Sequence, residues 1–515
     1  MSIDKGQSNI SLVKSAGIIS FATFLSRVLG LLRDIVIARL FGVYLYAQAF
    51  VIAFKIPNLF RDFVGEGATN AAFVPVFSEY SLKRSGKEFW ELANVVLNML
   101  LVILTAITII GIIFSPFIVR VAAPGFLASM EKFALTVRLN RIIFPYIILI
   151  SLAAYSTAIL NSLKHFSLPA FAPCLLNISI IVFASLFGEG IRGLSWGILV
   201  GGILQLAIQI PVLYKKGFRL KIPRTLNHPG ARDIGRLMLP RLLSSSIYQL
   251  NNFVDSIFGS LSWVVGEGGV AVLYFSYRLI QFPLGVFSNA VSQAILPTFS
   301  RQVATSDELE LKRTLSFGIR SVFFVMVPAG VFFMVLALPL IEFFFCRDKF
   351  DSYAAHLTAQ ALFFYSIGLC AYGANKVLQS CFFSLKDTLT PAKVSGLGLL
   401  LNIILNSVLM FPFKIAGIAL ATSISGIITF LTLFILAKRK IGDFGVREIG
   451  SSFLRIFFSG VGMGIICYLS VYLLSNRFLG IAVSLIAGFF SYLGFCLIFK
   501  VKELHQLFNL ARGYG

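Results

Sequence analysis

Residues 26–42 read SRVLGLLRDIVIARLFG and close the first long apolar run of the chain. Four charged side chains interrupt this otherwise lipid-compatible segment, namely Arg27, Arg33, Asp34 and Arg39. A cation at the centre of a membrane helix costs about 3 kcal/mol on insertion scales, so it needs a partner, a wet cavity or a function. The stretch therefore predicts a membrane helix whose charges serve a purpose inside the bilayer.

The composition of the whole chain agrees with this interpretation. The chain has 515 residues, of which 57% are hydrophobic and only 13% are charged. A soluble chain of this length would carry about a quarter charged residues. The polar opening MSIDKGQSN runs into the first apolar run without a small-residue cleavage site, so we expect that helix to be retained. We predict an all-α polytopic membrane protein.

Apolar runs about 20 residues long, the length that crosses a bilayer, recur along the chain. They predict fourteen transmembrane helices, near 10–32, 43–64, 90–118, 133–160, 168–187, 193–214, 234–258, 268–295, 315–345, 356–383, 390–412, 415–437, 451–474 and 478–500. Lys and Arg gather on alternate loops and at both ends of the chain. The positive-inside rule then places both termini in the cytoplasm.

The formal net charge of +22 could suggest a nucleic-acid partner, but the alternate-loop placement of the cations argues against one. The six cysteines are scattered without a CxxC pair, and the four histidines lack ligand spacing. We find no phosphate-cradling glycine loop, nucleophile elbow or metal-hydrolase pattern. The sequence thus predicts no cofactor, with one candidate sodium site as the exception described below.

A hidden repeat organises the predicted helices. Two pairs of short segments recur at an offset of 222 residues and a third pair at 224: PVFS 75–78 with PTFS 297–300, SLK 162–164 with SLK 384–386, and GLSWGILVGG 193–202 with GIALATSISG 417–426. Six predicted helices, an even number, separate equivalent points. The two halves should therefore share one orientation and be related by an axis along the membrane normal, as in transporters.

The repeat divides the chain into four parts. We expect an N-terminal six-helix bundle at 1–214, a basic cytoplasmic linker at 215–236, a C-terminal six-helix bundle at 237–440, and helices 13 and 14 with a cytoplasmic tail at 441–515. Halves of this kind usually enclose a midplane cavity that opens alternately to each side. This arrangement favours a transporter over an enzyme.

Several cations lie inside or at the edge of predicted spans: Arg27, Arg61, Arg278 and Lys376. One interpretation is that each snorkels to an interface or pairs with a nearby acid such as Asp34, Asp62 or Glu66. The other is that they attract an anion inside a wet cavity. Arginine suits a phosphate because its planar fork donates two hydrogen bonds.

Three segments carry a resemblance to a known family: SRVLGLLRD at 26–34, FKIPNLFRDFVGEGATNAAFVPVFSEY at 54–80 and YRLIQFPLGVFSNAVSQAILP at 277–297. They resemble the signature segments of the MurJ (MviN) family, the lipid II flippases of bacterial peptidoglycan synthesis. Their fold is that of the multidrug/oligosaccharidyl-lipid/polysaccharide exporter superfamily. The likeness runs essentially from end to end.

The resemblance implies two bundles around a cationic central cavity. By match to the family motifs, the essential substrate-binding arginines would be Arg27, Arg33, Arg61 and Arg278, with Lys376 in a similar place. Asp34 and Glu66 are possible charge partners because they lie near these cations in the sequence. Helices 13 and 14 would form a groove for the polyprenyl tail. Gln48 and Tyr277 stand where an acid is common in the family, so the charge network here should be more positive or differently neutralised.

A candidate cation site consists of Asp255, Asn402, Asn406 and Thr422, because their oxygens could hold sodium. Some members of the family have a similar arrangement. Interhelical hydrogen bonding by buried amides is the alternative interpretation. Arg138 and Arg141 on the fourth predicted helix are interpreted as interfacial.

The favoured function is a flippase that moves lipid II across the bacterial inner membrane by alternating access. Its expected partners are lipid II itself, membrane lipids, and proteins of cell-wall synthesis and division. Export of another polyprenyl-linked saccharide or of drugs is an alternative, as is a membrane-embedded enzyme that uses the same lipid. Cationic drugs fit poorly with surplus arginine, and we see no loop long enough for the catalytic domain of such an enzyme. A scaffold of the division machinery would leave the internal arginines without a purpose.

Overall fold

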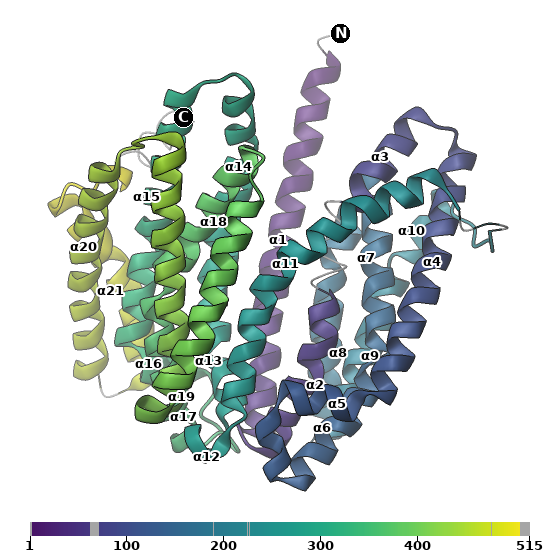
Figure 1. Ribbon diagram of the computed structural model, residues 1–515. Helices are drawn as coiled ribbons and strands as arrows, with labels where there is room; N and C mark the ends of the chain where they lie inside the picture. The colour runs from purple at the N-terminus through teal and green to yellow at the C-terminus, as the bar shows by residue number, and fades with distance from the viewer. Residues whose placement is uncertain are drawn as a thin grey trace. The chain divides into compact units, whose positions relative to one another are not determined.

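A computed structural model describes residues 3–61, 72–188, 190–223, 225, 227–474 and 476–504. These ranges consist of helices and short connections and contain no β-strand, which confirms the predicted all-α class (Figure 1). Contacts divide the chain into two compact units, Met1–Ser260 and Leu261–Gly515. The boundaries at 214, 236 and 440 derive from the sequence repeat, and they stay a prediction.

The first unit contains the first twelve helical elements. Within it, α8 packs against α1 and α9, and α2 packs against α6 and α7. The elements are α1 (Ile3–Phe41), α2 (Leu45–Arg61), α3 (Val74–Lys83), α4 (Gly86–Ile113), α5 (Ser115–Ala122), η2 (Pro124–Ala128), α6 (Met130–Ile143), α7 (Tyr146–Ser162), α8 (Ser167–Phe187), α9 (Ile191–Ala207), α10 (Ile210–Lys215) and α11 (Pro229–Gly259).

The second unit is built around α15, which packs against both α18 and α20. The last two helices, α20 and α21, lie side by side at an edge of this unit (Figure 1). The elements are α12 (Ser262–Val265), α13 (Gly269–Pro283), the π-helix η3 (Leu284–Ser288), α14 (Asn289–Ala304), α15 (Glu308–Val335), α16 (Ala337–Phe344), α17 (Ser352–Ile367), α18 (Leu369–Ser384), α19 (Leu389–Ile441), α20 (Val446–Leu473) and α21 (Arg477–Ile498).

Each of the fourteen predicted spans coincides with one helix, a broken series of helices or half of a long helix. In the described ranges, nine helices are long and apolar enough to cross a membrane, or ten if the pair α17 and α18, bent by 44°, forms one span. The shorter α2 is also apolar and contains Pro57. The chain is therefore a multi-pass membrane protein, and a total of fourteen is consistent with these helices.

The 53-residue helix α19 accounts for two predicted spans. A straight helix of this length would measure about 80 Å. However, Lys440 in its last turn forms an ion pair with Asp387, which lies just before its first residue. The backbone reverses at Lys414, which has a φ of 52°. The segments near 390–412 and 415–437 therefore form an antiparallel hairpin.

Gly417 is required where this hairpin closes. A Cβ atom at this position would lie 2.1 Å from the carbonyl oxygen of Leu409, a backbone atom that cannot move aside cheaply. We expect Gly417→Ala to lower the free energy of unfolding by about 1–3 kcal/mol through overpacking. The thermal midpoint of the detergent-solubilised protein measures this effect.

The matched control for this prediction is Gly396→Ala in the same helix, where a Cβ atom would meet nothing within 4 Å. Its midpoint should stay the same or rise slightly, because alanine favours helix more than glycine does. Equal midpoints for the two variants would contradict the tight closure of the hairpin.

The ion pair that joins the ends of the hairpin predicts a pH dependence. The Lys440 ammonium group, together with donors from Thr390, lowers the pKa of Asp387 to about 2. A lowered pKa stabilises the fold above the unfolded-state value of about 3.9, and this contribution is lost as the pH falls through about 2.

We therefore expect Asp387→Asn to lower the free energy of unfolding at pH 6 by less than about 1 kcal/mol, because Lys440 is partly exposed. The thermal midpoint at pH 6 should fall accordingly. The difference from the unmodified protein should shrink at pH 3. Glu91→Gln, which alters an exposed acid on α4, serves as the control. A penalty that is the same at both pH values would rule out the ionised carboxylate as its source.

Candidate functional site

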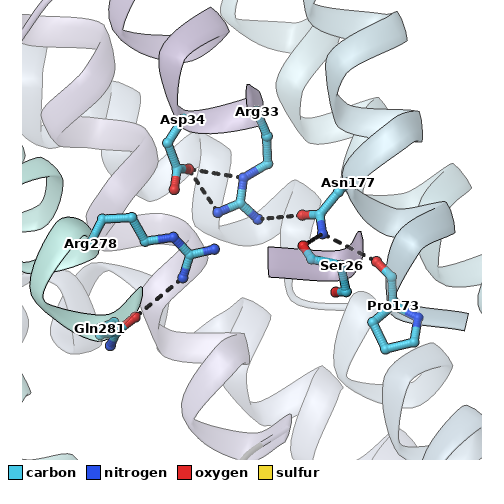
Figure 2. A network of polar contacts seen from close by, with 7 residues as sticks. All are labelled: Ser26, Arg33, Asp34, Pro173, Asn177, Arg278 and Gln281. Carbon is cyan, nitrogen blue, oxygen red and sulfur yellow. Dashed lines mark hydrogen bonds and ion pairs between the residues drawn. The ribbon is translucent and has the colours of Figure 1, made fainter. Parts of the chain in front are cut away.

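Arg33 and Asp34 form a buried ion pair on α1 (Figure 2). Nη2 and Nε of Arg33 lie 2.7 Å and 3.0 Å from Oδ1 of Asp34. Arg33 is 5% exposed and Asp34 is fully buried. The carboxylate thus neutralises the arginine charge in a place that water does not reach.

Asn177 of α8 extends this pair into a network that joins two helices. Its Oδ1 accepts a hydrogen bond from Nη1 of Arg33 at 3.1 Å, and its Nδ2 donates to the carbonyl oxygens of Ser26 and Pro173 (Figure 2). The Arg33 guanidinium also lies 6.0 Å from the ring centroid of Phe54 on α2. Arg33 therefore holds α1 against α8 and α2.

The other predicted cations of the first unit differ from Arg33. Arg27 lies earlier on α1 and is half-buried, so part of its side chain is accessible. Arg61 is the last residue of α2, but its side chain lies outside the described residues, as does Glu66. Asp34 forms an ion pair with its neighbour Arg33.

Lys55 of α2 is a further internal cation, which the sequence reasoning did not single out. It is half-buried and donates a hydrogen bond to the hydroxyl of Ser256 on α11, next to Asp255. Lys55 lies within FKIPNLFR at 54–61, part of a segment that carries the family resemblance, and this position could have marked it as a candidate. Hydropathy alone could not show that α11 supplies polar partners to α2.

Gln48 lies on the same helix, α2, and is 1% exposed. Because an amide carries no charge, this residue does not neutralise any of the internal cations. Its Nε2 atom has no hydrogen-bond partner within the described part of the chain. The more positive charge network expected from Gln48 stays a prediction.

In the second unit, Arg278 lies on α13 and is half-buried. Its Nη1 donates to Oε1 of Gln281, one helical turn later, at 3.2 Å (Figure 2). The neighbouring Tyr277 packs edge-on against Tyr365 of α17, with ring centroids 5.2 Å apart. Tyr277, which stands where an acid is expected, therefore packs against an aromatic ring.

Lys376 lies on α18, and its ammonium group donates to Oδ1 of Asn289 on α14. The same two helices are joined by the hydroxyls of Ser292 and Ser380, 2.8 Å apart. The π-helix η3 contacts α13, α14 and α18. Short π-helical segments are frequent at functional sites. The helices that carry Arg278 and Lys376 are therefore both packed against this irregular segment.

Three of the four predicted sodium ligands come together in the α19 hairpin. Nδ2 of Asn406 donates to Oδ1 of Asn402 at 3.0 Å, and Nδ2 of Asn402 donates to Oγ1 of Thr422 at 3.0 Å. This arrangement fits the alternative interpretation, hydrogen bonding between buried amides. Asp255 belongs to the first unit. The sodium site stays a prediction.

Arg138 and Arg141, interpreted as interfacial, are exposed on α6. They line a surface groove with a volume of about 680 Å³, together with apolar side chains such as Phe133 and Val137. Nε of Arg141 donates to the carbonyl oxygen of Ile112 at 3.3 Å. These residues are separate from the buried network around Arg33.

Both units carry ionisable side chains on their apolar helices. Among the described residues, no group of three or more His, Cys, Asp or Glu side chains could hold a metal ion. Each unit instead carries half-buried cations on otherwise apolar helices, Arg27 and Lys55 in the first and Arg278 and Lys376 in the second. Such groups bind anions well because a desolvated, charge-assisted hydrogen bond is strong.

Comparisons with known proteins identify the family. The sequence profile described as "Lipid II flippase MurJ" matches residues 37–488. The chain is 37% identical over 428 residues to the "Probable lipid II flippase MurJ" of Buchnera aphidicola from Acyrthosiphon pisum, covering 82% of this chain and 83% of the relative. It is 32% identical over 457 residues to the "Lipid II flippase MurJ" of Burkholderia cenocepacia, covering 87% of each.

Comparison with solved structures identifies the same family. One titled "Lipid II flippase MurJ, inward closed conformation" matches with a TM-score of 0.79 and 30% identity, covering 93% of this chain and 98% of that one. An inward-facing multidrug transporter of the MATE family shares the fold alone, with a TM-score of 0.67 and 16% identity over 81% of this chain and 95% of that one. This chain belongs to the MurJ lipid II flippase family and is a transporter rather than an enzyme.

Proposed function

We propose that this chain moves lipid II from the cytoplasmic to the outer leaflet of the bacterial inner membrane by alternating access, without a chemical step. The match to the MurJ family over residues 37–488 carries the proposal. Half-buried cations on apolar helices support it, since they suit a substrate that carries a diphosphate. In this proposal both termini are cytoplasmic, and the substrate path is a central cationic cavity.

The proposal divides the substrate by its chemistry. Arg27, Arg61, Arg278 and Lys376 contact the diphosphate and acidic headgroup, and Lys55 joins them because it is also an internal cation. The polyprenyl tail stays in lipid alongside α20 and α21, where exposed side chains are apolar. The tail then never loses its apolar surroundings, whereas the headgroup has a polar route.

Arg33 has a distinct place in this proposal. Its guanidinium already bonds with Asp34 and Asn177, so a direct contact with substrate requires that this network opens. If the network stays closed, Arg33 supports transport by holding α1 in position.

The decisive experiment reconstitutes the purified protein into vesicles that contain lipid II in one leaflet. Transfer to the other leaflet, followed with an impermeant modifying reagent, should occur faster than in protein-free vesicles. A parallel assay with a polyprenyl diphosphate that carries a different saccharide tests the alternative substrate. Transfer of that lipid but not of lipid II would overturn the proposal.

Depletion of the protein in cells provides the second test. We expect lipid II to accumulate on the inner leaflet, with normal synthesis of the lipid itself. Proteins of cell-wall synthesis and division are the partners that we propose on the outer side, where the product is consumed. An unchanged distribution of lipid II after depletion would contradict a role in its transport.

A further inference from the structure

The connection between α10 and α11 begins with a short non-helical segment at residues 217–222, which we call the strap. Two asparagine side chains of α4 form hydrogen bonds with the backbone of the strap. Oδ1 of Asn94 accepts from the backbone nitrogen of Lys221 at 2.7 Å, and its Nδ2 donates to the carbonyl oxygen of Arg219 at 3.0 Å. Nδ2 of Asn98 donates to the carbonyl oxygen of Lys221 at 3.1 Å. The strap is thus held in one place on α4.

Aromatic packing anchors the start of the strap. Phe218 is 8% exposed, and its ring lies 5.8 Å from that of Trp90 on α4. Gly217 has a φ of 102°, and a Cβ atom there would lie 3.1 Å from Nε1 of Trp90. Only glycine combines this backbone conformation with such a close approach. This turn directs the chain along α4.

The strap presents large apolar side chains outward. Leu220 is 61% exposed and Ile222 is 89% exposed. Next to them on α4, the turn after Asn98 contains Val102, 64% exposed, within a helix apolar enough to cross a membrane. Ile222 follows Lys221, whose carbonyl oxygen accepts from Asn98, one turn before Val102 on α4.

The sequence that contains these apolar side chains is basic up to Asp233. The residues from 215 to 232 include no Asp or Glu, and their cations are Lys215, Lys216, Arg219, Lys221, Arg224 and Arg232. The Arg219 guanidinium lies 5.4 Å from the ring centroid of Tyr214, which is itself exposed. Tyrosine is enriched at membrane–water interfaces because one end of its ring is apolar and the other polar.

We propose that the strap lies in the membrane interface and binds anionic phospholipids. Leu220 and Ile222 enter the boundary between headgroups and acyl chains, while Lys215, Lys216 and Lys221 contact lipid phosphates. Each cation near an anionic surface strengthens binding to that surface by about fivefold. This site is distinct from the transport path and binds lipids that are not transported.

Depth-dependent quenching in nanodiscs tests the proposal with the full-length protein. An environment-sensitive fluorophore is attached at Ile222→Cys, after the two half-buried native thiols are removed as Cys346→Ala and Cys370→Ala. The matched control is a label at Leu309→Cys, since Leu309 is 59% exposed at the start of α15 but lies between Glu308 and Glu310. The nanodiscs contain phosphatidylcholine with or without phosphatidylglycerol.

We expect quencher-labelled lipid to quench the label at position 222 but not at 309, and quencher-labelled phosphatidylglycerol to act more strongly than phosphatidylcholine. The combined change Lys215→Gln, Lys216→Gln and Lys221→Gln should abolish this lipid preference. Equal quenching by the two lipids in the unmodified strap would overturn the anionic site. Quenching at 222 by aqueous iodide but not by lipid would overturn membrane binding and favour an acidic protein partner.

Discussion

Replacing Arg278 with alanine is expected to abolish lipid II transport while the protein still inserts and folds. Arg278 is half-buried on α13, and its described hydrogen bond goes to the neutral side chain of Gln281. A hydrogen bond to a charged group contributes about 1.5–3 kcal/mol, so the loss should weaken headgroup binding by roughly 10- to 150-fold. The vesicle transfer assay and growth of cells that depend on the variant measure this effect.

Two control variants separate the role of the charge from that of packing. Arg278→Lys keeps the cation but loses the planar fork, so it should retain partial transport. Gln281→Ala removes a neutral partner of Arg278 and should have a much smaller effect than loss of the guanidinium. Arg27→Ala should resemble Arg278→Ala. Normal growth of cells that depend on either alanine variant would argue against the proposed role of internal cations.

The largest effect on stability is expected for Asp34→Ala. This change leaves the buried Arg33 without the carboxylate that lies 2.7 Å from its Nη2 atom. Removal of one partner of a buried ion pair typically costs about 3–5 kcal/mol, because the remaining charge stays desolvated. Thermal unfolding of the detergent-solubilised protein should show a much lower midpoint, and the yield of folded protein should fall.

The double variant Arg33→Met with Asp34→Leu is the matched control. It removes both charges and keeps apolar bulk, so its midpoint should recover most of the loss. Its transport activity then decides the role of Arg33. A stable double variant that transports lipid II would show that Arg33 positions helices, whereas a stable but inactive one would favour direct contact with substrate. A double variant as unstable as Asp34→Ala would contradict the unpaired-charge explanation.

The prediction of the fold succeeded because membrane insertion depends on local sequence. The free energy of placing a segment in lipid is a sum over about 20 consecutive residues, so an apolar run identifies a helix without knowledge of its neighbours. The two runs on either side of Lys414 illustrate this, since they were predicted as two spans and form the two arms of α19. Breaks such as the 44° bend between α17 and α18 were not predicted, because they depend on packing.

The residues of the candidate site were predicted only in part. Motif likeness predicts Arg27, Arg33, Arg278 and Lys376 as site residues, and their roles stay a prediction, but it does not supply their partners. In the sequence, Asp34 is only one of several nearby acids that could pair with an internal cation. Asp34 forms an ion pair with the adjacent Arg33, whose guanidinium is also held by Asn177, 144 residues away in the chain.

The sequence by itself determined that this protein is a multi-pass helical membrane protein with cations on its apolar helices. Hydropathy and charge are properties of each segment, so they can be read without a fold. Only the tertiary structure decided which of those cations is neutralised, which is half-buried, and that Lys55 meets Ser256 of a distant helix. Electrostatic partners depend on distances of a few ångströms between segments far apart in the chain, and packing alone sets those distances.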